Sequence, residues 1–318
     1  MQMKEVAARV LTLSLVLLLV GMTASPMSFT NANVTRSDMT NIRVGVYYGA
    51  ESVSDSSRTA LVRMFEWMNA TVEILHPSDV KSGELAGYHM VVIPGGNAGN
   101  YISDLGTTGL EKIRSFVREG GSYFGVCAGA YLACDTLIWE GVGIQYQLDI
   151  FNGTGVGAID EIAPWPNYGM CSIEVNRSST VIDLSDEPNE HRVMYYGGPF
   201  FVLDNPEDAQ TLATYSVNDE PAMIALGFHE GRAFLSGPHA EWEEDSERDG
   251  IDQFDIYDDE GSEWPMMLSV SLWLVENVAE TTEVPDQSPA MLALVIAGGA
   301  VVAAAVLVLS RMRRSRAM

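Results

Sequence analysis

The chain has 318 residues, of which 43 are acidic and 18 basic, and its formal net charge is −25. A surface this acidic repels nucleic acid and anionic lipid, so we expect no nucleic-acid partner. The length is that of one domain of about 240 residues with additional segments at both ends.

The amino end has the layout of a secretory signal. Two positive charges, Lys4 and Arg9, precede an uncharged and mostly apolar run at 10–21. This run is shorter than the about 20 residues that a membrane-spanning helix needs, which is typical of a signal sequence. We expect residues 1–25 to be a signal peptide or a retained signal anchor, and residues 26–40 to be a polar linker.

Residues 41–280 predict one α/β domain. Strands and helices alternate through its first half, with strands expected at 42–48, 71–75, 88–93 and 122–126 and helices at 56–68 and about 108–119. Repeated strand–helix–strand units favour a mainly parallel sheet with helices on both faces, which is a three-layer sandwich. In such sheets the functional crevice lies beyond the carboxyl ends of the strands.

The residues that follow the last of these strands predict a nucleophile. Strand 122–126 leads directly to Cys127, and the residues after it favour helix. A strand that turns into a helix this abruptly strains the turning residue, and Gly125, Ala128 and Gly129 leave room for the strain. The Cys127 sulfur then lies at the amino end of a helix, where partial positive charge favours the thiolate. The alternative is that Cys127 is an ordinary buried cysteine.

The second half of the domain predicts short strands separated by turns. We expect strands at 171–175, 180–184, 200–203, 222–228 and 232–237, and an amphipathic helix at 264–278. Gly197 and Gly198 stand in a tight turn before the strand at 200–203. They either line the pocket or serve only as a structural turn.

Two segments offer partners to the Cys127 sulfur. Gly95 and Gly96 form a turn after an apolar strand and can present backbone N–H groups to a developing oxyanion. His239 and Glu241 follow the strand at 232–237, and alternate residues of an extended chain point the same way. His239 can then act as a base that Glu241 orients.

A glycine turn after a strand, a cysteine elbow and a late H-x-E, in this order, resemble the class I glutamine amidotransferase-like superfamily. Within it, the segments GVCAGAYLAC (125–134) and MYYGGP (194–199) look most like the domain at the amino end of some eukaryotic biotin-protein ligases. The resemblance covers about residues 41–280 and implies a flavodoxin-like α/β fold. It also implies a triad of Cys127, His239 and Glu241, with Gly96 and Ala128 at the oxyanion.

One position departs from the superfamily pattern. True glutaminases of the superfamily usually carry glutamine four positions after the nucleophile, where this chain has Tyr131. The sequence also has no GRGR-type loop for biotinyl-adenylate, so the chain is not a biotin ligase by itself. We expect a cysteine-dependent hydrolase of small-molecule or peptide amides, without cofactor or metal. The alternative is a binding or sensing module that uses the same fold without turnover.

The three cysteines and a set of glycosylation triplets bear on the compartment. Cys134 and Cys171 can form a disulfide if Cys127 stays reduced, and a buried role for Cys134 is the alternative. N-x-[ST] triplets mark possible acceptors at Asn33, Asn69, Asn152 and Asn176.

The segment 241–263 is strongly acidic, with twelve carboxylates and one basic residue, Arg248. Its match to a calcium-binding loop is weak, because Ile256 stands where a glutamate ligand is needed. We expect a solvated acidic loop, and the alternative is a loop that binds a cation outside the cell.

The carboxyl end predicts a membrane anchor. Residues 290–309 are an uncharged run of 20 residues, followed by four arginines between 311 and 316. At about 1.5 Å of rise per residue this run crosses a bilayer core of about 30 Å. The arginines favour a cytoplasmic carboxyl end, 310–318, and residues 281–289 form a short stalk. We therefore expect a single-pass protein of the cell membrane, with the lipid bilayer as a partner and the main domain outside the cell.

Overall fold

The computed structural model describes residues 37–145, 148–243, 247–257 and 261–276. The expected signal, stalk, transmembrane helix and basic tail, together with most of the linker, lie outside the described residues. Within the described ranges, no helix combines the length and apolar character that a membrane crossing requires.

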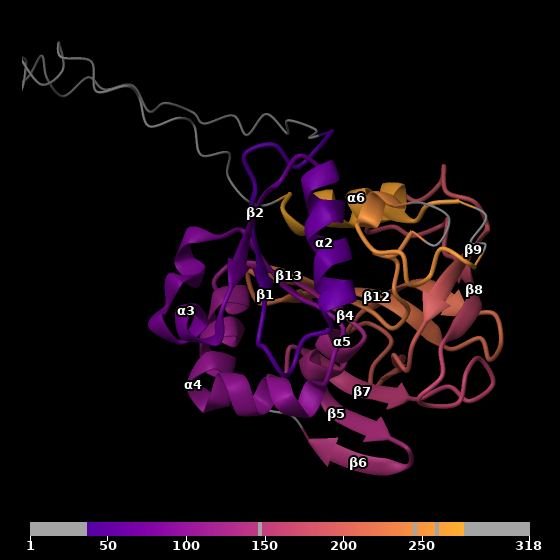
Figure 1. Ribbon diagram of the computed structural model, residues 1–318, viewed down its shortest axis with the longest axis horizontal. Helices are drawn as coiled ribbons and strands as arrows, with labels where there is room; N and C mark the ends of the chain where they lie inside the picture. Colours follow the sequence, from indigo (N-terminus) through magenta and orange to yellow (C-terminus); the bar gives the residue numbers. More distant parts are fainter. Residues whose placement is uncertain (1–36, 146–147, 244–246, 258–260, 277–318) are drawn as a thin grey trace, which may run out of the picture. The chain divides into compact units, whose positions relative to one another are not determined.

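A nine-stranded sheet forms the centre of the domain (Figure 1). Its spatial order is β2 (Thr71–Leu75), β1 (Arg43–Tyr47), β3 (Met90–Ile93), β4 (Ser122–Val126), β13 (Gly231–Ser236), β12 (Pro221–Phe228), β11 (Gln210–Tyr215), β8 (Gly169–Val175) and β9 (Glu190–Tyr195). The strands from β2 to β13 pair in parallel, and those from β13 to β9 pair antiparallel. The parallel sheet expected from the sequence is therefore half of a mixed sheet. A hairpin as tight as that of β12 and β13 can join only antiparallel strands.

Helices cover both faces of this sheet, as the sequence predicts. On one face, Val44 and Val46 of β1 share a core with Phe65 of α2 (Asp55–Trp67) and Met267 of α6 (Trp264–Leu274). On the other face lie α3 (Pro77–Ser82), α4 (Ala98–Arg118) and α5 (Ala128–Ala133), whose apolar side chains share a core with Ile93. Two short 3-10 turns are η1 (Glu84–Gly87) and η2 (Glu247–Asp249). Because alternate strand residues face opposite ways, one strand serves both cores.

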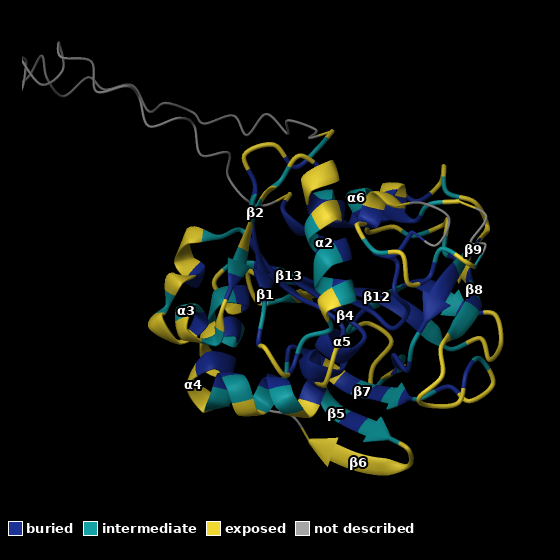
Figure 2. Cartoon of the chain, viewed as in Figure 1, coloured by how far each residue is buried: buried dark blue, intermediate teal, exposed yellow. Residues whose placement is uncertain are grey.

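A second, smaller sheet lies on the same side as α4 and α5, and the sequence did not predict it as a unit. Its order is β10 (Phe200–Leu203), β7 (Phe151–Gly157), β5 (Cys134–Trp139) and β6 (Val142–Gln145). Phe151 and Phe201 pack edge to face in the core beneath it. Strand β6 forms the outer edge and is exposed along its whole length (Figure 2). This sheet brings β5 and β6 beside the carboxyl ends of the central strands.

Three expected elements differ in the structure. Helix α4 begins at Ala98, about ten residues before the expected start, because Asn97 caps it and the kink at Gly106 (φ 56°) lets it continue. Residues 180–184 form a bend and irregular chain, and the antiparallel partner of β8 is β9 instead. Helix α6 is apolar on most of its surface, with only Ser269 and Ser271 as polar side chains, so it is a core helix and not an amphipathic one.

The three cysteines are buried and none is disulfide-bonded, so the disulfide considered from the sequence is absent. Cys134 belongs to the core beneath α5, whereas Cys171 belongs to the core on the opposite face of the large sheet. Their thiols instead donate to the carbonyls of Ala130 and Val193. Both cysteines therefore serve packing.

Part of the acidic segment is buried, which corrects the expectation of a solvated loop. Glu243, Asp249 and Glu263 are at most 3% exposed. Glu243 lies 2.5 Å from the guanidinium of Arg248, which neutralises its charge. Desolvation raises the pKa of Asp249 to about 6, against hydrogen bonds from the backbone of Ile251 and Glu243 that lower it. This segment closes over α2 and α6.

The sequons have different surroundings. Asn69 and Asn152 are exposed and donate to the carboxylates of Asp38 and Asp208, while Asn176 is half-buried and its amide donates to the Thr211 carbonyl. Asn33 lies outside the described residues.

Candidate active site

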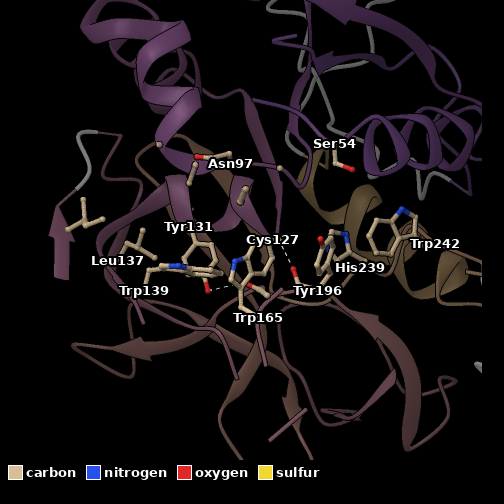
Figure 3. Close-up of a pocket in the computed structure, with 16 residues that line it drawn as sticks. Ser54, Asn97, Cys127, Tyr131, Leu137, Trp139, Trp165, Tyr196, His239 and Trp242 are labelled. Carbon is tan, nitrogen blue, oxygen red and sulfur yellow. Dashed lines mark hydrogen bonds between the residues drawn. The ribbon is translucent and has the colours of Figure 1, made fainter. Parts of the chain in front are cut away.

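Three central strands end at one crevice, as a parallel arrangement requires. Strand β3 leads to the Gly95-Gly96 turn, β4 leads to Cys127, and β13 leads to His239. Because β3, β4 and β13 are neighbours in the sheet and run in parallel, their carboxyl ends lie side by side. The segments that the sequence singled out therefore meet (Figure 3).

Cys127 stands at a strained turn between β4 and α5. Its backbone has φ 50° and ψ −106°, a region that costs a non-glycine residue about 1–3 kcal/mol. The two glycines beside it make the turn possible. A Cβ on Gly129 would lie 2.0 Å from the Ile93 carbonyl oxygen, and one on Gly125 would lie 2.8 Å from that of Gly129. The Cys127 N–H donates to the Ser236 carbonyl over 2.8 Å, which ties the elbow to β13.

His239 and Glu241 form a buried pair. The distance from His239 Nδ1 to Glu241 Oε1 is 2.8 Å, and the two residues are 2% and 1% exposed. Strand β13 ends at Ser236, so a turn brings the two side chains together and not the strand alternation that the sequence suggested. The backbone N–H of His239 donates to the Met194 carbonyl over 2.8 Å, which fixes this turn against β9.

The imidazole of His239 is placed to hold a proton. Burial alone would lower its pKa, but the charges of Glu241 and Cys127 and the hydrogen bond to Glu241 outweigh burial and raise the pKa above the ordinary value. With Nδ1 directed to Glu241, Nε2 is the buried nitrogen that remains for the cavity. The ring also stacks on Trp242, with centroids 3.8 Å apart and planes at 5°. Both contacts fix the orientation of the ring.

Ser57 holds the carboxylate of Glu241 in place. Its hydroxyl donates to Glu241 Oε1 over 2.6 Å and accepts the N–H of Gly95 over 2.9 Å. The indole of Trp264 donates to the backbone carbonyl of Glu241. Helix α2, the β3 turn and α6 thus hold Glu241 in place. Nothing in the sequence around Ser57 distinguishes it from a helical surface residue.

The glycine turn has two separate roles. Gly95 leaves room for the imidazole, because a Cβ there would lie 2.6 Å from His239 Cε1. Gly96 passes close to Ser52, whose carbonyl oxygen would lie 2.1 Å from an added Cβ. Among the described residues, the Gly96 and Ala128 N–H groups donate no hydrogen bond to other protein groups. Both residues line the same cavity as the Cys127 sulfur.

The cavity has a volume of about 390 Å³. Its lining residues are Ser54, Gly96, Asn97, Ala98, Gly99, Cys127, Ala128, Tyr131, Leu137, Trp139, Ile144, Trp165, Tyr196, Gly197, His239 and Trp242. Cys127 is 7% exposed, and its thiol donates to the Tyr196 carbonyl over 3.5 Å. A volume of this size accommodates a small molecule or one side group of a larger one.

Tyr131, at the position where glutaminases of the superfamily usually carry glutamine, lines this cavity. Its hydroxyl donates to the Gly197 carbonyl over 3.1 Å. A Cβ on Gly157 would lie 1.8 Å from that hydroxyl, so Gly157 makes room for the larger side chain. Of the two glycines in the turn before β10, Gly197 faces the cavity. Gly198 packs behind it, where a Cβ would lie 1.9 Å from the Gly237 carbonyl oxygen.

The sequence reasoning missed the aromatic side chains Trp139, Trp165 and Trp242 of this cavity. They come from strand β5, a loop and the segment after Glu241 (Figure 3). Trp242, directly after Glu241, gave no signal, because the sequence does not show which indoles face a cavity. Within the described ranges, no group of three or more His, Cys, Asp or Glu side chains is placed to hold a metal ion.

Comparison with known proteins settles the family. A family model described as "Biotin-protein ligase, N terminal" matches residues 42–260, more than half of the chain. The chain belongs to this family. The match confirms the resemblance that the cysteine elbow and the MYYGGP segment indicated. It covers nearly all of the described domain.

Two relatives share part of this region. A biotin-protein ligase of Schizosaccharomyces pombe is 28% identical over 165 residues, which are 48% of this chain and 25% of that one. An uncharacterized protein of Chlamydia muridarum is 30% identical over 164 residues, which are 48% of this chain and 60% of that one. The chain therefore matches less than two thirds of the length of either relative.

Solved structures with lower similarity include two glutamine amidotransferases. The alignment with one of them has a TM-score of 0.45 and 19% identity, and it covers 62% of this chain and 90% of the other chain. The alignment with the other, from Thermotoga maritima, has a TM-score of 0.41 and 16% identity, and it covers 74% of this chain and 92% of the other chain.

Proposed function

We propose that this domain hydrolyses an amide or a related acyl compound through a thioester on Cys127. The observation that carries the proposal is the position of His239, which is hydrogen-bonded to Glu241 at 2.8 Å and lines one cavity with the Cys127 sulfur. A nucleophile, a base and a group that orients the base are the minimum for this chemistry.

In the first step the proton of the Cys127 thiol passes to Nε2 of His239. The sulfur then attacks the carbonyl carbon, a C–S bond forms, and the carbonyl oxygen becomes an oxyanion. The N–H groups of Gly96 and Ala128 donate to that oxygen. They are available for this role because, among the described residues, they donate to no other protein group. Glu241 stabilises the imidazolium throughout.

In the second step the proton on Nε2 passes to the leaving nitrogen, and the C–N bond breaks. A water molecule gives a proton to His239 and attacks the thioester carbon. The C–S bond then breaks, the carboxylic acid leaves, and the proton returns to the sulfur. One water and one amide thus give one acid and one amine.

The trapped intermediate tests this proposal. The full-length chain is mixed with p-nitrophenyl benzoate, and intact-mass and peptide analysis locate the acyl group. We expect one benzoyl group on Cys127, an initial burst of nitrophenol and slow release afterwards. Cys127→Ala should lose the burst, and Cys171→Ala, which removes a buried thiol away from the cavity, should keep it. Acylation without preference for Cys127 would contradict the proposal.

A second candidate is a binding module without turnover, and one contact favours it. The Cys127 thiol donates to the Tyr196 carbonyl, which is an interaction of the protonated sulfur. If that state persists when ligand binds, the cavity binds without reacting. Ligands that protect Cys127 from alkylation and raise the melting temperature, with no burst from any acyl compound, would support the module.

We also propose that the chain is tethered to the cell membrane with the described domain outside the cell. The uncharged run at 290–309 and the arginines after it support this orientation. Protease added to intact cells should digest the domain and leave the carboxyl-terminal tail, detected by an epitope placed after residue 318. A domain protected until the cells are lysed would contradict the proposal.

A further inference from the structure

The cavity beside Cys127 has no charged wall apart from the triad. Among its lining residues within the described ranges, the titratable side chains are Cys127, Tyr131, Tyr196 and His239, and none is Lys, Arg, Asp or Glu. The chain as a whole carries a net charge of −25, so the uncharged lining is a local property. Apart from Cys127 and His239, which the proposed reaction uses, a ligand charge that enters here finds no partner of opposite sign among these side chains.

Four rings form a continuous surface on one side of this cavity, which we call the aromatic wall: Tyr131, Trp139, Trp165 and Tyr196. Tyr131 and Trp139 meet edge to face at 5.9 Å between centroids, and Trp139 and Trp165 do so at 5.3 Å. Trp165 stacks on Tyr196 at 5.2 Å and 25°. The four residues come from α5, β5, a loop and the turn after β9, so the fold assembles the wall from distant segments (Figure 3).

Gly197 lets two of these indoles converge. Its φ of 66° suits glycine, and a Cβ there would lie 2.9 Å from the ring of Trp165 and 3.2 Å from that of Trp139. The wall therefore depends on the absence of one side chain. Trp165 is 46% exposed and Ile144, on the edge strand β6, is 43% exposed. These two residues mark the open side of the cavity.

A zwitterionic amino acid fits this lining poorly. Its ammonium and carboxylate groups would lose water without gaining an ion pair, which costs several kcal/mol per unpaired ion. The Tyr131 hydroxyl is already committed to the Gly197 carbonyl. Two of the free backbone donors, at Gly96 and Ala128, are used by the oxyanion in the proposed reaction.

We propose that the substrate of this site is an amide or ester whose acyl part carries an uncharged planar ring, which lies against the aromatic wall while its carbonyl meets Cys127. This inference rests on the proposed function for the reaction and on the lining for the specificity. Flat rings gain from stacked and edge-to-face contact with indoles. A cation would gain from the ring faces as well, but it would enter an enclosed cavity with no carboxylate in the lining.

Alkylation by three matched probes tests the specificity. Each probe carries a chloroacetamide, and the attached group is a phenethyl ring, a zwitterionic amino acid or a trimethylammonium group. The rate of Cys127 modification in the full-length chain is divided by the rate of glutathione with the same probe. We expect the ring probe to exceed the other two by about 10-fold or more, which is about 1.4 kcal/mol.

Variants show whether the aromatic wall causes the preference for the ring probe. Trp165→Ala and, separately, Trp139→Ala should bring the three corrected rates to within about twofold of each other. Iodoacetamide, which has no side group, gives the intrinsic reactivity of Cys127 in each variant, and each corrected rate is divided by it. Trp67→Ala is the matched control, because Trp67 is 40% exposed and is absent from the cavity lining.

The outcomes separate this inference from the proposed function. A zwitterionic or cationic probe that reacts as fast as the ring probe, or a preference that survives in both tryptophan variants, overturns the inference while the triad can still operate. A clear ring preference without any acyl-enzyme or turnover overturns the hydrolase and keeps the specificity. Because Trp165 is largely exposed, its variant should fold even if Trp139→Ala does not.

Discussion

Nδ1 of His239 lies 2.8 Å from Oε1 of Glu241, in a site where neither residue is more than 2% exposed. A buried imidazole and a buried carboxylate at this distance share one charge-assisted hydrogen bond, and the proton on the ring is stabilised by it. The pair fixes which ring nitrogen remains for the cavity. Each of the following predictions changes one contact around it or one feature elsewhere in the domain.

Removing the charge of Glu241 should change the pH dependence of the site. The carboxylate helps to raise the pKa of His239, so Glu241→Gln should lower that pKa and move the alkaline limb of the activity profile to lower pH. At neutral pH we expect a loss of about 100-fold in acylation rate. Glu230→Gln, an exposed change at the β12–β13 turn, is the control. An unchanged profile would show that Glu241 is only structural.

Replacing Gly95 should displace the imidazole. A Cβ at this position would lie 2.6 Å from His239 Cε1, so Gly95→Ala forces the ring away from its place beside Glu241. We expect the acylation burst to fall at least about 10-fold while the far-ultraviolet circular dichroism stays unchanged. Gly143→Ala is the matched control, because a Cβ there meets nothing within 4 Å. Equal activity of the two variants would contradict the described packing.

Ser57 should contribute to both stability and activity. Ser57→Ala leaves Glu241 without a 2.6 Å donor and the Gly95 N–H without its acceptor. Leaving buried groups unsatisfied costs about 1–3 kcal/mol each, so we expect a clear drop in the free energy of unfolding, measured in urea. Ser56→Ala, on the same helix but hydrogen-bonded only to Ser54, should change it by less than about 1 kcal/mol. Equal effects of both changes would argue against the Ser57 network.

A second buried histidine predicts a pH-dependent stability that is independent of catalysis. Nδ1 of His191 lies 3.1 Å from Glu263 and Nε2 lies 3.2 Å from Glu187. Burial lowers its pKa, but the hydrogen bonds and charges of both carboxylates outweigh this effect and raise it to about 9.

The sign follows from the higher affinity of the folded state for the proton. The stabilisation should be complete below about pH 6.5, the ordinary pKa, and should disappear as the pH rises through about 9. We expect up to about 3 kcal/mol less stability at high pH than at pH 6, measured by urea unfolding. His191→Gln should show a much smaller difference between the two pH values. A wild-type free energy of unfolding that does not fall as the pH rises from 6 through about 9 would contradict this pairing of His191 with the two carboxylates.

The sequence predicted the parts of the site that depend on local geometry. Short apolar strands next to glycines located the elbow at Cys127 and the turn at Gly95, because few residues tolerate such backbone conformations. The order of the motifs then indicated the family, which the match to residues 42–260 confirms. The pairing of His239 with Glu241 was anticipated, although a turn and not a strand produces it.

The features that the sequence did not predict depend on contacts between distant segments. The small sheet was missed because β6 and β7 are rich in glycine, which weakens a strand pattern. Residues 180–182 have β-branched side chains, yet β8 pairs with β9 and leaves 180–184 outside the sheet. The aromatic wall joins α5, β5, a loop and the β9 turn, and only the folded chain shows that Trp139 and Trp165 share a cavity.

The pH dependence of Cys127 alkylation by iodoacetamide tests the central claim, that the Cys127 sulfur is activated by His239, most directly. We predict that at neutral pH the wild-type rate exceeds that of His239→Ala by about 10-fold or more, because the variant lacks the imidazole that takes the thiol proton. Cys134 and Cys171 are buried away from the cavity and should stay unlabelled in both. Coincident wild-type and His239→Ala profiles would contradict the account.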